Sequence, residues 1–120
     1  MIVAYNDYGT LVADGTAENK ITFTSAAGAG YENPGDWDGL WFYGGTGAQT
    51  ILNYCDISYG GGYSNYSGNI ILESTPANVP AITNCNITYS SSYGIYLNNA
   101  SPTLSGNTFS NNTQGDFNVK

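Results

Sequence analysis

The chain has 120 residues, of which 41% are hydrophobic and only 9% are charged. It is long enough for one domain, which we place at residues 1–120, and it is too apolar to be disordered. Nine acidic residues stand against two basic residues and no histidine, so the formal net charge is −7; this argues against nucleic acids and anionic lipids as partners, because lysine and arginine side chains bind both.

Short segments rich in Ile, Thr, Tyr and Phe recur along the chain, and in order they are 11–13, 21–24, 40–42, 52–59, 70–72, 82–89, 95–97, 104–111 and 117–119. Their length and composition predict β-strands, and no stretch sustains the 3.6-residue period of an amphipathic helix. Glycine, proline, asparagine and serine gather between the segments, where turns need them. The sequence therefore predicts an all-β protein.

The segments repeat at a regular spacing. Segments 52–59, 82–89 and 104–111 share one residue pattern and begin 30 and 22 residues apart. Segments 40–42, 70–72, 95–97 and 117–119 share another and are separated by 30, 25 and 22 residues. Such periods are typical of solenoids, in which each coil packs on its neighbours. We read 11–13 and 21–24 as one more copy of the two segments, which gives two strands per coil, four nearly complete coils and a fifth beginning at Phe117.

Equivalent positions recur in the same direction along the chain, so stacked strands should be parallel. The most regular motifs are Gly15-Thr16 followed by Ile21-Thr22-Phe23-Thr24-Ser25, Pro34-Gly35-Asp36-Trp37-Asp38-Gly39-Leu40, Ile82-Thr83-Asn84-Cys85-Asn86-Ile87, Tyr93-Gly94-Ile95 and Asn107-Thr108-Phe109-Ser110-Asn111-Asn112. This pattern resembles the right-handed parallel β-helix repeat family, which includes pectate-lyase-like enzymes and many extracellular surface proteins. The resemblance implies a right-handed solenoid of about four to five short coils without a capping helix, and an extracellular or cell-surface location.

The repeat register predicts the core. Two inward ranks should be Leu52, Ile82 and Leu104, and Ile57, Ile87 and Phe109. Cys55 and Cys85 hold equivalent places in adjacent coils, about 4.8 Å apart. Parallel neighbours point their side chains the same way, which suits disulfide torsion badly. We therefore expect a reduced, buried pair that packs as small hydrophobes, with a disulfide as the alternative.

The acidic residues that come into question for catalysis are Asp36, Asp38, Asp56 and Glu73. Asp36 and Asp38 follow Pro34 in a turn, where Asp commonly bonds its own backbone. A pectate-lyase-like site uses an Arg or Lys base, but the chain has no Arg, and we expect neither Lys20 nor Lys120 to face a cleft from a repeat position. The chain also has no His for a polygalacturonase-like or nucleophile–base site. Two Cys without His do not complete a usual zinc site. The sequence thus predicts no catalytic residue, metal or cofactor.

Two ranks of polar residues should face outward from the second strand of each coil. One is Thr22, Asp56, Asn86 and Thr108, and the other is Thr24, Ser58, Thr88 and Ser110. Exposed strands commonly carry Thr, so plain solvent exposure explains them. A flat hydroxyl face could alternatively order water, as in ice-binding solenoids, although Asp56 interrupts the first rank. Tyr59 and Tyr89 are equivalent and should stack on each other near a corner.

An outward apolar stripe is expected on the first strand of each coil. It consists of Trp41, Ile71 and Tyr96, with Val12 as the fourth member. Unless loops cover it, such a patch indicates contact with glycan rings, another chain or a neighbouring domain. Trp41, Ile71 and Tyr96 are therefore the candidate binding residues.

The sequence favours a non-catalytic structural or adhesive module of an extracellular or cell-surface protein. The first alternative is a carbohydrate-binding β-helix, or a carbohydrate-active one whose catalytic residues lie outside this segment. The second is a subunit that stacks end to end into filaments, since uncapped strands invite pairing. Expected partners are polysaccharides or cell-surface glycans and further copies of the chain, with neither nucleic acid nor membrane insertion. We read 1–8 as the end of an incomplete coil and expect no signal peptide in this segment.

Overall fold

The computed structural model describes residues 2–4 and 9–118, with side chains described from residue 9 onward. These residues form short strands and no helix, and hence none long and apolar enough to cross a membrane. The strands are β1 (Ile2–Ala4), β2 (Val12–Asp14), β3 (Ile21–Phe23), β4 (Leu40–Phe42), β5 (Ile51–Asn53), β6 (Cys55–Ser58), β7 (Gly68–Glu73), β8 (Ala81–Thr83), β9 (Asn86–Thr88), β10 (Tyr93–Asn98), β11 (Thr103–Ser105), β12 (Thr108–Ser110) and β13 (Gly115–Phe117).

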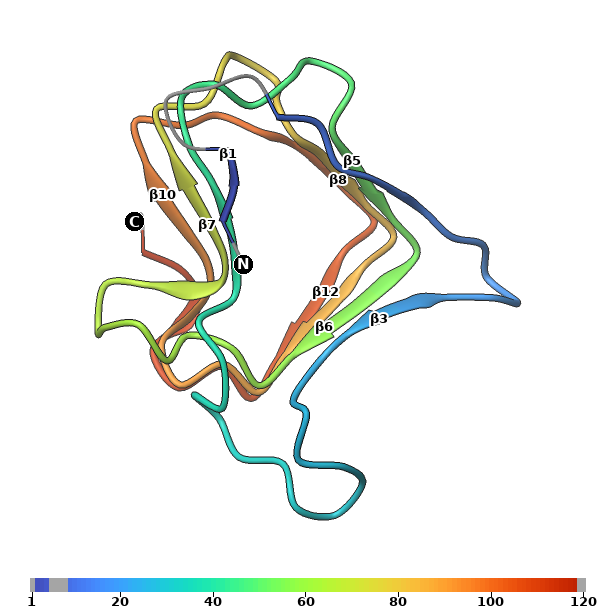
Figure 1. Cartoon of the computed structure of the whole chain (residues 1–120), viewed down its shortest axis with the longest axis vertical. Coiled ribbons are helices and arrows are strands. Elements are labelled where there is room, and N and C mark those ends of the chain that lie inside the picture. Colours follow the sequence, from blue (N-terminus) through green and yellow to red (C-terminus); the bar gives the residue numbers. More distant parts are fainter. Residues whose placement is uncertain (1, 5–8, 119–120) are drawn as a thin grey trace.

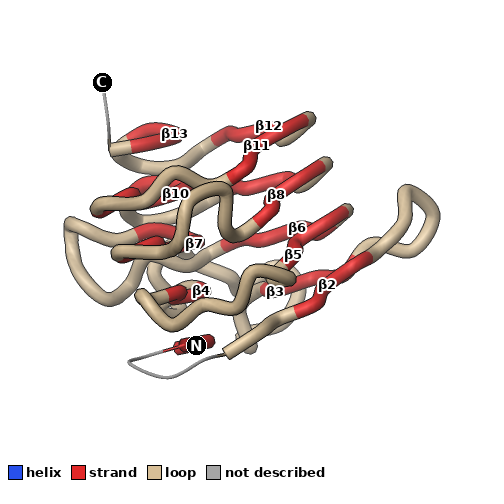
Figure 2. Tube along the Cα trace, turned by 90° about the horizontal axis from the view of Figure 1, so that it is seen from above, coloured by secondary structure: helices blue, strands red, loops and turns tan. Residues whose placement is uncertain are grey.

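Every third strand joins the same parallel sheet. The first sheet has the order β1-β4-β7-β10-β13, the second β2-β5-β8-β11 and the third β3-β6-β9-β12. Viewed down the shortest axis, the sheets form the three sides of one coiled outline (Figure 1). From the side, successive coils lie in layers with matching strands above one another (Figure 2). The chain is a parallel β-solenoid of about four coils, which confirms the predicted fold class.

Each coil contains three strands, so the prediction of two strands per coil is wrong. The segment 52–59 is divided at Tyr54, which has a positive φ of 52° and turns the chain from β5 into β6. Asn84 and Gly106 occupy the same corner in the next coils, also with positive φ. A single residue in the left-handed region changes the chain direction without ending the apolar pattern, because inward residues resume directly after it.

Val12 does not belong to the apolar stripe, contrary to our expectation. It pairs with Ile51 in the second sheet, and its side chain is 62% exposed. The segment 11–13 precedes β3 in the chain as β5 precedes β6, so it copies the start of 52–59 rather than 40–42. In the first sheet β4 pairs with β7 on one side and with β1 on the other, where Ile2 aligns with Trp41. Residues 1, 5–8 and 119–120 of the predicted outer coils lie outside the described residues.

The core follows the predicted register. Pairing aligns Leu52 with Ile82 and Ile57 with Ile87, and all four side chains are fully buried. Leu104 pairs with Ile82 and Phe109 with Ile87, as predicted. Phe109 is only partly buried and Leu104 is 37% exposed, because β11 and β12 are the outermost strands of their sheets and pair with another described strand on one side only. The first sheet adds a further buried rank of Leu40, Ile70 and Ile95.

The two cysteines are free and fully buried, as the stacking argument predicts. The Cys85 thiol lies 3.3 Å from the Leu52 carbonyl oxygen, to which it donates. Contact with the Cys85 thiol, and then burial, raises the pKa of Cys55 far above its usual range. Both cysteines pack among the apolar side chains of the solenoid core.

Asparagine side chains connect one coil to the next. Asn69 is fully buried; its Oδ1 accepts from the Gly60 backbone N–H at 2.6 Å, and its Nδ2 donates to the Thr88 carbonyl at 2.8 Å. Asn107 bonds the preceding coil in the same two-sided manner, accepting from Cys85 N–H and donating to the Ile82 carbonyl. An amide carries both donor and acceptor, so it satisfies both backbone groups at a corner where the sheet ladder is interrupted.

Candidate functional site

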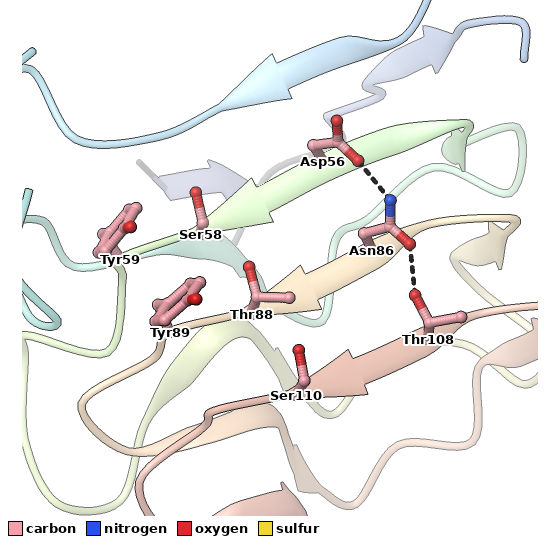
Figure 3. Close-up of a pocket in the computed structure, with 8 residues that line it drawn as sticks. All are labelled: Asp56, Ser58, Tyr59, Asn86, Thr88, Tyr89, Thr108 and Ser110. Atoms are coloured by element: carbon pink, nitrogen blue, oxygen red, sulfur yellow. Dashed lines mark hydrogen bonds between the residues drawn. The ribbon is translucent and has the colours of Figure 1, made fainter. Parts of the chain in front are cut away.

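An open groove of about 440 Å³ lies on the outer face of the third sheet. It extends over β6, β9 and β12, one strand from each of three successive coils, and Figure 3 shows the side chains that line it. The residues are Asp56, Ser58, Tyr59, Asn86, Thr88, Tyr89, Thr108 and Ser110. They include the outward polar ranks that the sequence predicts in these coils.

Strand alternation places these side chains outside. Ile57 and Ile87 point into the core, so their neighbours along β6 and β9 point outward. Parallel pairing then aligns Asp56, Asn86 and Thr108 in one rank and Ser58, Thr88 and Ser110 in the other. Along each rank, like positions recur at the strand spacing of about 4.8 Å.

The first rank is a directed chain of hydrogen bonds (Figure 3). The Thr108 hydroxyl donates to Asn86 Oδ1, and Asn86 Nδ2 donates to Asp56 Oδ1 at 2.8 Å. Lys20 Nζ lies 3.9 Å from the same Asp56 oxygen. Because each donor along the chain points toward Asp56, the chain ends in a negative charge at the edge of the groove.

The second rank offers hydroxyl groups to the solvent. Ser58 Oγ shares a hydrogen bond of 2.8 Å with Thr24 Oγ1 in the coil below. The hydroxyls of Thr88 and Ser110 have no hydrogen-bond partner within residues 9–118, and Figure 3 shows them projecting from the strands in line with Ser58. A hydroxyl both donates and accepts, so these two groups are available to a polar ligand.

Tyr59 and Tyr89 border the groove where β6 and β9 end. Their rings stack as predicted, with centroids 5.1 Å apart and planes inclined by 9° (Figure 3). Both residues have positive φ, 65° and 56°, a conformation that costs a non-glycine residue about 1–2 kcal/mol. Partial burial, followed by the nearby Glu32, raises the pKa of Tyr59. Its hydroxyl therefore stays neutral and can donate to a ligand.

The predicted stripe forms and is partly covered. Trp41, Ile71 and Tyr96 align in register on the first sheet, as the sequence indicates. Ile71 is only 2% exposed, and the Trp41 ring lies 5.2 Å from that of Tyr63 in the connection between β6 and β7. The Trp41 indole N–H is buried and has no hydrogen-bond partner among the described residues. Partial covering of the stripe agrees with expectation, whereas ligand binding by these three residues stays a prediction.

The remaining candidate acids do not line the groove: Asp36 and Asp38 lie in the connection between β3 and β4, and Glu73 lies on β7. Asp36 is a turn former, as predicted: its Oδ2 accepts from the Ser25 hydroxyl at 2.5 Å and from Asn33 N–H at 2.9 Å. These bonds, with that from Ser25 the larger influence, lower the pKa of Asp36. Glu73 ends β7 in the first sheet. The described residues contain no group of three or more His, Cys, Asp or Glu side chains that could hold a metal ion.

The chain matches no protein-family model, no curated protein and no solved structure. Its function must therefore be inferred from the groove. Reasoning from the sequence found the two polar ranks and the tyrosine pair separately, yet did not unite them into one site. The link was present in the sequence, because Tyr59 and Tyr89 each follow directly after a member of the second rank.

Proposed function

We propose that the chain is a non-catalytic binding module of an extracellular or cell-surface protein, and that its groove on the third sheet binds polysaccharide. The carrying observation is the pair Tyr59–Tyr89, which is held in the left-handed conformation beside two ranks of polar side chains. Strained residues concentrate at functional sites, where the surrounding structure maintains them. In this proposal, the groove is the surface that performs the adhesive role expected from the sequence.

Sugars combine ring hydroxyls with apolar C–H groups, and the groove offers a counterpart to both. The free hydroxyls of Thr88 and Ser110 can donate to and accept from the hydroxyls of a sugar. The rings of Tyr59 and Tyr89 offer an apolar surface to its C–H groups, and their hydroxyls offer a polar one. The groups recur every coil, at about 4.8 Å. An extended glycan lying along the solenoid axis would therefore meet similar partners at successive sugars.

Binding without cleavage is the better interpretation of this site. Glycosidases of the usual kinds hold two carboxyl groups on either side of the scissile bond. Asp56 is the only carboxylate that lines the described groove, and its Oδ1 already accepts from Asn86.

We also retain the expectation that the solenoid is right-handed, because parallel crossovers nearly always are.

Isothermal titration with neutral hexasaccharides of glucose, mannose and N-acetylglucosamine tests the proposal. We expect at least one to bind, and Tyr89→Asn to weaken that binding about tenfold. Asn keeps the corner conformation, since Asn111 adopts it in the next coil. The matched control is Tyr54→Asn, the same change at a positive-φ corner that does not line the groove. If no glycan binds, or if both variants lose binding equally, the groove is not the site.

End-to-end association is a second candidate that one observation favours. Leu104 lies in an inward rank of the core but is 37% exposed on β11. β11, β12 and β13 are the outermost strands of their sheets, so each has one edge that is not paired within the described residues. A second copy that added its own strands there would bury Leu104. Sedimentation velocity over a range of concentrations should then show a rising mass, which a strictly monomeric protein would contradict.

A further inference from the structure

The charge of the groove indicates which glycans it accepts. Asp56 stands at the end of the hydrogen-bond chain from Thr108 and Asn86, and its side chain is 40% exposed. Asn86 Nδ2 and Lys20 Nζ both approach Oδ1. Oδ2 accepts no hydrogen bond from any residue between 9 and 118. The carboxylate thus retains room for one more donor.

Lys20 shows how a cation reaches this carboxylate. It is the only lysine in the described part of the chain, and it lies against Asp56 although eight of the protein's nine acids lie in the same part. The N–O distance of 3.9 Å is too long for a hydrogen bond, and both side chains are 40% exposed. Such a surface pair contributes little to stability, so a ligand ammonium can displace it.

The rest of the protein supports a cationic ligand. The formal net charge is −7, and the chain contains no arginine and no histidine. An acidic field attracts a polycation over long distances and repels polymers of uronic acids. Asn86 and Thr108 hold the places equivalent to Asp56 in the next two coils, where they suit a hydroxyl or an N-acetyl group. One ammonium for every few sugars is therefore sufficient.

We propose that the groove prefers glycans that carry free amino groups, such as partly deacetylated poly-N-acetylglucosamine, with one sugar ammonium bound at Asp56 in place of Lys20. This rests on the proposed function and specifies its ligand class. The remaining sugars follow the two polar ranks along the axis beside Tyr59 and Tyr89.

The test compares a glucosamine hexamer with an N-acetylglucosamine hexamer, two chains with the same backbone that differ in charge. Titration calorimetry at mildly acidic pH and low ionic strength should give a Kd about tenfold lower for the amine form. Asp56→Asn should abolish this difference, so that the two hexamers bind with the same Kd. Lys20→Met should strengthen amine binding about threefold, because the competing ammonium is removed.

Glu73→Gln is the control, since it removes one negative charge from the first sheet, away from the groove. It should leave the tenfold preference intact. Equal binding of the two hexamers by the wild-type protein would overturn the amine preference and leave polysaccharide binding standing. Equal losses in Asp56→Asn and Glu73→Gln would reduce the preference to general charge attraction and overturn the site. Failure of both hexamers and of the other neutral hexasaccharides to bind would overturn the proposed function as well.

Discussion

Two leucines in one rank allow the packing of the solenoid to be tested with a single kind of substitution. Leu52 and Leu104 both align with Ile82, one coil below it and one coil above it. Leu52 is fully buried, whereas Leu104 is 37% exposed. Replacing each with alanine removes the same atoms from the same register and differs only in what surrounds them.

The expected losses differ about twofold or more. Removing three buried carbons costs about 2.4 kcal/mol of transfer free energy at about 0.8 kcal/mol each, and an enclosed cavity adds to this. Leu52→Ala should therefore lower the free energy of unfolding by about 3–5 kcal/mol. At Leu104, which is 37% exposed, more than a third of the transfer term is absent and no closed cavity forms, so we expect about 1.5 kcal/mol.

Urea unfolding monitored by far-UV circular dichroism measures both values, with an unchanged m-value as the condition for comparing them. Repeating the series at two protein concentrations adds a second readout. If Leu104→Ala costs as much as Leu52→Ala at both concentrations, the exposure of Leu104 in the structure does not describe the protein in solution. If the cost at Leu104 rises with concentration, a second copy covers it and the end-to-end candidate gains support.

Three further changes test local features. Asp36→Asn should lower the melting temperature at neutral pH, and this difference should close as the pH falls below 3.8, the ordinary Asp value, and through the lowered pKa of Asp36: a carboxyl with a lowered pKa stabilises the fold above its unfolded pKa and loses this contribution as it is protonated. Thermal melts over a pH series measure this, and a difference in melting temperature that does not change with pH would contradict this role. Cys55 and Cys85 should resist a thiol reagent in the native state and react fully after unfolding without reductant, as mass spectrometry would show; unreactive thiols in the unfolded chain would reveal a disulfide. Tyr54→Asn should raise the free energy of unfolding by about 1 kcal/mol by relieving positive-φ strain, and a loss on denaturant titration would show that ring packing outweighs the strain.

The stacking register could be predicted because each core residue has its neighbour at a fixed offset in the sequence. Ile57 meets Ile87, and Phe109 follows at the next repeat, whatever the loops between them do. The aromatic stack of Tyr59 on Tyr89 follows from the same rule. Solenoid contacts are made between adjacent coils, so a periodic sequence contains most of the information on its core.

The corners and the coverings are less evident in the sequence. Tyr54 has no turn chemistry of its own, and only its alignment with Asn84 and Gly106 marks the bend that makes three strands of two segments. The covering of Trp41 depends on Tyr63, in a connection that does not recur in the other coils. Non-repeating loops lack the periodic signal, so their packing on the stripe could not be inferred from the spacing.

Comparing two sets of equivalent corner residues shows which residues folding explains and which the groove explains. In the set Tyr54, Asn84 and Gly106, two of the three coils use residues that tolerate positive φ well, whereas Tyr59 and Tyr89 keep aromatic rings in adjacent coils. Two strained residues cost about 2–4 kcal/mol together, and one aromatic pair returns about 0.5–1.5 kcal/mol beyond its burial. Tyr89 leaves 41% of its surface exposed, so burial closes only part of that gap. Folding alone gives little reason to keep both rings, whereas a ligand in the groove would use them. Tyr89→Asn should therefore reduce binding without a comparable loss of stability.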